Sequence, residues 1–361
     1  MFTLSTSVDS GTGQNPSLGK TIFFPGVKLC TRTYDSSTLL DRSVVDWLLE
    51  EENPGVKYLA LTKLLGTSPR RKEAVEARTK IHTWQPIRKI LARQKRNGGW
   101  DSGRTWYLPK HKSTVWQLLI LSQTEIDPSI PSVRKMCDYA FRFQKSSGAF
   151  YSGTTRNRGD DWARLAGCLN GNVVAALCRL GWAGDPRIGR AVDHLLSFQE
   201  GDGGWGCRSF GYHRFDKHSC FMGTICALDG LIEYSAHSRS SDVRRAIQGS
   251  CEFLLMHRLY KADHHGWKII RPDYVRLRAP WLVAYDILRG LRAITRAGIT
   301  DDERMKDALH LLLAKRNSKG RWVREVPWPS ATYSSFGWVG REDKWVTLNA
   351  LLTLEKLASN G

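Results

Sequence analysis

Three cysteines and one histidine in the middle of the 361-residue chain could together hold a metal ion. The thiols belong to Cys168, Cys207 and Cys220, and the imidazole belongs to His218. Thiolate sulfur and imidazole nitrogen are donors that tetrahedral zinc prefers, and bound zinc would hold a thiolate nucleophile. The chain has no Cys-x-x-Cys pair, so the ligands would have to converge from separate segments. The alternative is that Cys168 and Cys220 are core cysteines and that His218 caps a helix.

Two adjacent carboxylates, Asp160 and Asp161, are the candidate acids. Burial raises the pKa of a carboxyl group, so that it can donate a proton to a substrate near neutral pH. The alternative is that the pair forms a solvated turn or caps a helix.

A basic cluster is the candidate site for a diphosphate. Arg208, Arg214 and Lys217 lie within ten residues of one another, with Tyr212 between them. Cations and helix N-termini bind phosphate groups, and a magnesium ion would accompany a diphosphate substrate. The alternative is an exposed basic loop without a ligand.

Aromatic residues could line an apolar cavity for such a substrate. The chain contains 14 Trp, 12 Phe and 11 Tyr, and aromatic π faces stabilise cations. The tryptophans that precede or open apolar helices are the predicted lining residues: Trp162, Trp281, Trp338 and Trp345. Most other aromatic residues are expected in the core.

An internal repeat must position all of these groups. Gln, a short polar turn with Gly, and an aromatic residue recur at 94–100, 144–150 and 199–205, with diverged copies at 264–267 and 316–322. The aromatic ends at 100, 150, 205, 267 and 322 give a period of 50–62 residues. Each copy follows an amphipathic helix and precedes a more apolar one. The apolar helices are expected at 113–121, 169–180, 222–231, 281–291 and 345–354.

Two helices per period predict an all-α array with outer amphipathic and inner buried helices. About six such pairs can close into a ring, which is an (α/α)6-type toroid. We therefore expect one toroid domain over residues 41–361 and a disordered or loosely docked tail over residues 1–40.

Successive inner helices of such a ring run parallel, so equal offsets along them mean equal height. Cys168 lies nine residues before Leu177, and Cys220 lies eight before Leu228, in the next inner helix. The Gly-Gly turn at 203–204 brings Cys207 to the same region. The register therefore predicts that the candidate zinc ligands meet at the N-terminal rim of the inner helices.

The repeat resembles the superfamily of triterpene cyclases, protein prenyltransferase β subunits and lanthionine cyclases. The resemblance covers residues 85–361 and implies an α/α toroid that handles an isoprenoid or similar apolar substrate in a central cavity. His218 and Cys168 match the segments that supply zinc ligands in protein prenyltransferases. The aspartate ligand of that family is replaced by Ala166, and the acidic residue after the Gly-Gly turn is replaced by Cys207. A Cys/Cys/His set would instead resemble the lanthionine cyclases.

Three functions stay open. One is a zinc-thiolate enzyme that acts on an isoprenoid diphosphate or another apolar electrophile. The second is a metal-free terpene cyclase, similar to squalene–hopene cyclases, with Asp160 as the acid, although the first Asp of the Asp-x-Asp-Asp motif is Arg158 here. The third is a non-catalytic toroid that binds lipid or nucleic acid; no nucleic-acid-binding signature supports this. Protein prenyltransferases pair with a partner subunit, and nothing in this chain resembles one.

Composition narrows the partners and the compartment. Hydrophobic residues make up 41% and charged residues 25%, which excludes wholesale disorder. No apolar run approaches the ~18 residues of a membrane-spanning helix, and the first residues lack the pattern of a secretory signal, so we expect a cytoplasmic protein. The net charge of +19 favours anionic partners.

Metal analysis tests the predicted zinc site. We expect the purified full-length protein to contain about one zinc ion per chain, because a tetrahedral site needs only the four donors named above. Cys168→Ser should lower the zinc content measured by mass spectrometry. A zinc-free wild-type protein would contradict the site and leave the two metal-free functions.

Overall fold

The computed structural model describes residues 40–153, 165–206, 218–329 and 331–359. All of these belong to one compact unit that spans residues 34–361. Nearly every regular element in the described part is a helix. The exceptions are two short antiparallel strands, β1 (Lys261–Ala262) and β2 (Lys268–Ile269).

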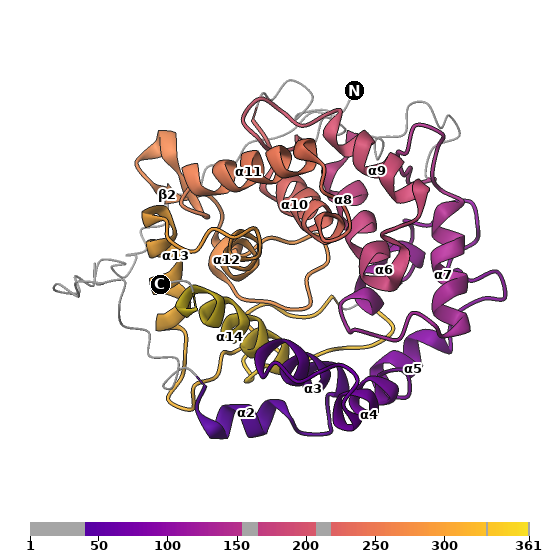
Figure 1. Cartoon of the computed structure of the whole chain (residues 1–361), viewed down its shortest axis with the longest axis horizontal. Helices are drawn as coiled ribbons and strands as arrows, with labels where there is room; N and C mark the ends of the chain where they lie inside the picture. The colour runs from indigo at the N-terminus through magenta and orange to yellow at the C-terminus, as the bar shows by residue number, and fades with distance from the viewer. Residues whose placement is uncertain (1–39, 154–164, 207–217, 330, 360–361) are drawn as a thin grey trace, which may run out of the picture. The chain divides into compact units, whose positions relative to one another are not determined.

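The inner helices surround the centre of this unit (Figure 1). They are α3 (Pro54–Leu59), α6 (Thr114–Ser122), α8 (Gly167–Leu177), α10 (Phe221–Ser235), α12 (Ile287–Arg296) and α14 (Lys344–Ala358). Two of them continue into π-helical turns, η1 (Ala60–Leu64) after α3 and η3 (Cys178–Trp182) after α8. Most of their side chains are buried. Helix α14 packs against α3, so the last inner helix closes the ring on the first.

The outer helices pair with the inner ones (Figure 1). They are α2 (Arg42–Leu48), α4 (Lys72–Ile81), α5 (Gln85–Leu91), α7 (Pro131–Phe141), α9 (Pro186–Leu196), α11 (Ser241–Met256) and α13 (Lys306–Ala314). Each of them has solvent-exposed residues. Short 3-10 turns lie at η4 (Asp263–His265), η5 (Pro272–Val275) and η6 (Glu303–Met305). The prediction of an all-α toroid is confirmed. None of the described helices is both long and apolar enough to cross a bilayer.

The glutamine of each repeat turn ties neighbouring outer helices together. The Gln199 amide nitrogen donates to the Gly203 carbonyl of its own turn at 2.7 Å and to the Ala246 carbonyl of α11 at 3.0 Å. The other two copies make the same pair of bonds, from Gln94 to Gly98 and Ser132 and from Gln144 to Gly148 and Arg187. All three repeat glutamines therefore have the same structural role.

The tryptophan of three of the turns joins an outer helix to the inner helix that follows. The indole nitrogen of Trp205 donates to the Leu195 carbonyl of α9 at 3.0 Å. Its backbone nitrogen donates to Thr224 Oγ1, in the first turn of α10, at 3.1 Å. The equivalent pairs are Trp100 with Ile90 and Thr114, and Trp322 with Leu312 and Thr347.

Glycine permits the closest approaches. Gly203 has a φ of +87°, and a Cβ there would lie 2.2 Å from the carbonyl oxygen of Gly249 in α11. In α8, a Cβ on Gly171 would lie 2.4 Å from the Cα of Ala227 in α10. A side chain at either place would push two helices apart, because a carbon atom cannot fit at these distances.

Two segments differ from the expectation. Trp267, at the end of one diverged repeat copy, lies in the β1–β2 hairpin, is 41% exposed and has the Arg258 guanidinium 4.4 Å from its ring.

The apolar helix expected at 281–291 begins only at Ile287, because Asp286 caps it by accepting a hydrogen bond from the Arg289 backbone at 2.9 Å. Residues before Asp286 form a non-helical segment at the centre of the ring.

Loss of one repeat glutamine should destabilise the fold. We expect Gln199→Ala to lower the free energy of unfolding by about 1–3 kcal/mol, because it leaves two carbonyl groups without their donor. Urea denaturation measures this change. The matched control is Gln248→Ala on the exposed face of α11, which should change stability by less than about 0.5 kcal/mol. Equal stability of the two variants would contradict the bridging role.

Candidate functional site

A cavity of about 420 Å³ lies among the inner helices. It is lined mostly by their C-terminal halves, not by the N-terminal rim where the sequence predicted a site. Apolar lining comes from Leu59, Leu119 and Leu352, together with Trp281 and Trp345. Ten lining residues are ionisable: the basic Lys63, Arg179, Arg289, Arg292, Arg296 and Lys356, and the acidic Glu125, Asp229, Glu233 and Glu355.

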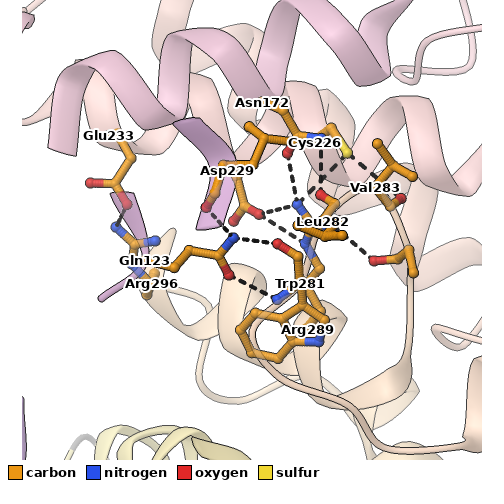
Figure 2. A network of polar contacts seen from close by, with 12 residues as sticks. Gln123, Asn172, Cys226, Asp229, Glu233, Trp281, Leu282, Val283, Arg289 and Arg296 are labelled. Atoms are coloured by element: carbon orange, nitrogen blue, oxygen red, sulfur yellow. Dashed lines mark hydrogen bonds and ion pairs between the residues drawn. The ribbon is translucent and has the colours of Figure 1, made fainter. Parts of the chain in front are cut away.

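A segment at residues 279–286, here named the crossing segment, runs through the centre of the ring (Figure 2). The Gln123 amide, just after α6, pairs with the backbone of Trp281: its oxygen accepts from the Trp281 nitrogen at 2.8 Å, and its nitrogen donates to the Trp281 carbonyl. Asn172 of α8 donates to the Leu282 carbonyl at 3.0 Å. Side chains of the inner helices therefore satisfy backbone groups that a helix would have satisfied internally.

Arg289 is the central cation of the network and is fully compensated (Figure 2). Its Nε and Nη2 lie 3.0 and 2.8 Å from Asp229 Oδ2 of α10. It also donates to Asn172 Oδ1 at 3.2 Å and to the Ala284 carbonyl at 2.8 Å. With its side chain only 4% exposed, this pair joins α8, α10, α12 and the crossing segment.

Glu233 compensates two arginines at once. Its Oε1 lies 2.8 Å from Arg179 Nε and 2.8 Å from Arg296 Nη2. Burial alone would raise the pKa of Glu233, but the charges of Arg179 and Arg296 and their hydrogen bonds lower it to about 2. Glu233 is therefore ionised at neutral pH, and one negative charge serves two positive ones.

Arg292 lies near both of these arginines and has no carboxylate of its own among the described residues. Its side chain makes no hydrogen bond or ion pair within them, although it is partly buried. Burial and the charges of Arg296 and Arg179 lower the pKa of Arg292 to about 9, and the charges of Asp229 and Glu233 only partly oppose this. This wall of the cavity therefore carries positive charge that the described residues do not balance.

Glu125 is the cavity carboxyl best suited to donate a proton. It follows α6 at a φ of +60°, a backbone conformation that glycine adopts far more readily. Its carboxyl group makes no hydrogen bond to any described residue. Burial raises the pKa of Glu125, and the negative charge of Glu233 adds to the rise, while Arg179, Lys63 and Arg78 oppose it.

The predicted zinc ligands are only partly within the described residues. Cys168 lies in the first turn of α8, and Cys220 is the N-cap residue of α10; both are half-buried. His218 is exposed. Cys207 lies outside the described residues, and within them no group of three or more His, Cys, Asp or Glu could hold a metal ion. Zinc binding therefore depends on Cys207 and stays a prediction.

The other predicted site residues divide in the same way. Two of the four tryptophans, Trp281 and Trp345, line the cavity, whereas Trp338 is 76% exposed and does not. The remaining candidates lie outside the described residues: Asp160, Asp161, Trp162, Arg208, Tyr212, Arg214 and Lys217.

Sequence reasoning missed the charged residues of the cavity. Asp229 and Glu233 stand four residues apart within an apolar inner helix, and Arg289 and Arg292 stand three apart in another. Charged residues are rarely buried unless they are paired, so their presence in apolar helices was the available signal. Glu125 had no such signal, because in the sequence it lies in a polar stretch after a helix, where a glutamate is common.

Comparisons with known proteins leave the function to be argued from this cavity. No protein-family model and no curated protein matches the sequence. Among solved structures, a glycosyl hydrolase of family 88 from Bacteroides vulgatus is 10% identical, with a TM-score of 0.49 over 90% of this chain and 98% of that one. A possible member of family GH105 from Salmonella enterica is 11% identical, with a TM-score of 0.47 over 94% and 97%. The type II terpene cyclase MstE from Scytonema is 14% identical, with a TM-score of 0.44 over 90% and 97%. These proteins are enzymes, but such distant similarities concern the fold alone.

The shared carboxylate of Glu233 should make stability depend on pH. Its pKa is about 2 in the folded protein against 4.5 as the ordinary value, so the unfolded chain binds the proton more readily. The stabilisation is complete above about pH 4.5 and is lost as the pH falls toward about 2. We expect Glu233→Gln to lower the free energy of unfolding by about 3 kcal/mol at pH 7 and by much less at pH 3.

Urea denaturation at a series of pH values measures the difference. Glu76→Gln removes the same charge from the exposed face of α4 and serves as the matched control. A Glu233→Gln deficit that is the same at pH 3 and pH 7 would show that the carboxylate charge is not what holds the two arginines.

Proposed function

We propose that the protein is an enzyme that acts on an isoprenoid or comparably apolar substrate in the central cavity, with Glu125 as the proton donor. The observation that carries this proposal is a carboxyl group that faces the cavity without a hydrogen-bond partner among the described residues. Its raised pKa keeps a larger fraction protonated near neutral pH than for an exposed glutamate. The strained backbone supports the same view, since strain of this kind is concentrated at functional sites.

The walls suit an apolar substrate that passes through a cationic state. Two tryptophans and three leucines line the cavity, and its volume of about 420 Å³ lies within the range of small-molecule sites. An indole face attracts a cation within about 6 Å of the ring. The Gln123 amide holds the Trp281 backbone, and the Trp281 indole nitrogen donates to Asp286 Oδ2 at 3.2 Å. The ring is therefore fixed before any substrate binds.

The proposed step balances without a further reactant. The O–H bond of Glu125 breaks, and its proton adds to one carbon of a substrate double bond. The π electrons form the new C–H bond and leave a cation on the other carbon, which can be attacked by a second double bond of the same substrate. The Glu125 carboxylate then takes a proton from a carbon next to the final cation, which gives a neutral isomer and restores the acid. Such a reaction needs no oxidant or reductant.

A zinc-thiolate transfer reaction is the second candidate, because Cys168 and Cys220 lie at the starts of adjacent inner helices. When bound, zinc would supply a thiolate nucleophile there. Cys168 and Arg179 lie eleven residues apart on one continuous helical run, so about 16 Å separates the two regions along its axis. The two chemistries would therefore take place at different ends of the ring.

The role of Glu125 can be separated from its effect on stability. We expect Glu125→Gln to reduce conversion of prenyl diphosphates at least about 100-fold, because the amide cannot donate the proton. Mass spectrometry of the products of geranylgeranyl and farnesyl diphosphate measures the rate. The wild-type rate should also fall as the pH rises and Glu125 ionises.

Glu125→Gly is the control for a merely structural role. Glycine relieves the positive φ, so this variant should be as stable as the wild type or more stable, yet inactive. A Glu125→Gln variant with the wild-type rate would overturn the assignment of the acid. A wild-type protein that converts neither prenyl substrate would overturn the proposed substrate class.

A further inference from the structure

We infer that Arg179, Arg292 and Arg296 form an anion site at the C-terminal end of the cavity, and that this site takes a diphosphate group. The inference deepens the proposed function, because it assigns the headgroup of the substrate to named residues. It places that headgroup on the wall next to α12 instead of on the basic loop of Arg208, Arg214 and Lys217.

The spacing of arginines along α12 gives one face of the helix a row of cations. Arg289, Arg292 and Arg296 stand three and four residues apart, so they lie on the same side of the helix. All three line the cavity, and Arg179 reaches it from η3, the continuation of α8. The site is therefore built from two parts of the ring that both pack against α10.

The charges on this wall do not cancel. Asp229 is engaged by Arg289, which leaves Glu233 as the partner of both Arg179 and Arg296. Three guanidinium groups thus face one carboxylate, since Arg292 has no partner among the described residues. The wall has an excess of two positive charges, which a dianion would neutralise.

The remaining charged groups of the cavity do not remove this excess. They are two lysines, Lys63 of η1 and Lys356 of α14, and two glutamates, Glu125 and Glu355. With both glutamates ionised, these four charges sum to zero. Protonation of Glu125 makes the cavity more positive, not less. Over all ten ionisable lining residues, six are basic and four are acidic, so the excess is the same for the whole cavity.

Guanidinium chemistry and the cavity walls indicate the class of ligand. Arginine binds phosphate oxygens through pairs of parallel N–H groups, and it stays charged where a buried lysine would lose its proton. A monocarboxylate would neutralise only one of the two excess charges. A diphosphate on the arginines would leave an attached prenyl chain against Trp281 and Trp345.

Binding of inorganic diphosphate to the full-length protein tests the site without any turnover. We expect isothermal titration calorimetry to show one site, weakened by added salt, and the ligand to raise the melting temperature. Arg292→Gln should weaken diphosphate binding about ten- to a hundredfold, because a charge-assisted contact is lost. Its own melting temperature should not fall, since the substitution removes a cation that no described residue neutralises. Arg88→Gln, on the exposed face of α5, removes the same charge and should bind like the wild type.

Other ligands and variants in the same binding experiment show where on the protein the diphosphate binds. Farnesyl diphosphate should bind more tightly than inorganic diphosphate if the prenyl chain uses the tryptophan wall. Unchanged diphosphate binding in Arg292→Gln, with loss of binding on replacement of Arg208, Arg214 and Lys217 by glutamine, would overturn the inference. Intact binding by an inactive Glu125→Gln variant would support both proposals, whereas intact binding with a fully active one would overturn only the proposed acid.

Discussion

A side-chain amide that bridges two outer helices is the interaction on which the rest of the ring depends. A helical hairpin of this kind cannot bury its inner helix alone, so every pair needs its neighbours at a fixed distance and angle. The amide of Gln199 sets that distance by bonding its own turn and the backbone of α11 at the same time, and the glycine of the turn allows the two backbones to meet. The same glutamine bonds recur along the chain, and tryptophans equivalent to Trp205 bond the inner helices. Together these contacts hold a linear series of helical hairpins in a closed ring.

A closed ring of helices creates a central space that must be filled or used. Here the crossing segment fills part of it. The charged side chains around the rest come from α10, α12 and α14, from the π-helical continuations of α3 and α8, and from the turn after α6. Buried charges are tolerated when they are paired, and five of the ten ionisable lining residues are paired here: Arg289 with Asp229, and Glu233 with two arginines. Two partly buried groups on the same walls are not. Within the described residues, the Arg292 side chain makes no ion pair and the Glu125 carboxyl group accepts no hydrogen bond.

The fold was predictable because its determinants repeat locally. Each repeat turn contains a Gln, a Gly and an aromatic residue within seven positions. These residues bond the neighbouring helices, and the period of the repeat indicates how many such turns the chain contains. The cavity was not predictable in the same way, since its contacts join residues far apart in the chain. Arg289 bonds Asp229 across 60 residues and Asn172 across 117, and no local pattern encodes these distances. The crossing segment shows the same limit. Its composition resembles an inner helix, but it is non-helical and is held by contacts with Gln123 and Asn172.

The crossing segment meets the inner helices near their middle and so separates the two candidate reactive regions of the ring. Leu282 bonds Asn172 in the middle of α8, and the Val283 carbonyl lies 3.9 Å from the Cys226 sulfur in the middle of α10. Cys168 and Cys220 lie on the N-terminal side of this level, whereas Glu125, Arg179 and Arg292 border the cavity on the C-terminal side. A thiolate at the N-terminal end and an anion bound at the C-terminal end would therefore lie on opposite sides of the crossing segment. A substrate bound by the arginines would meet Glu125 and the two tryptophans, which line the same cavity. On this geometry we propose the carboxyl group, and not a cysteine, as the reactive group.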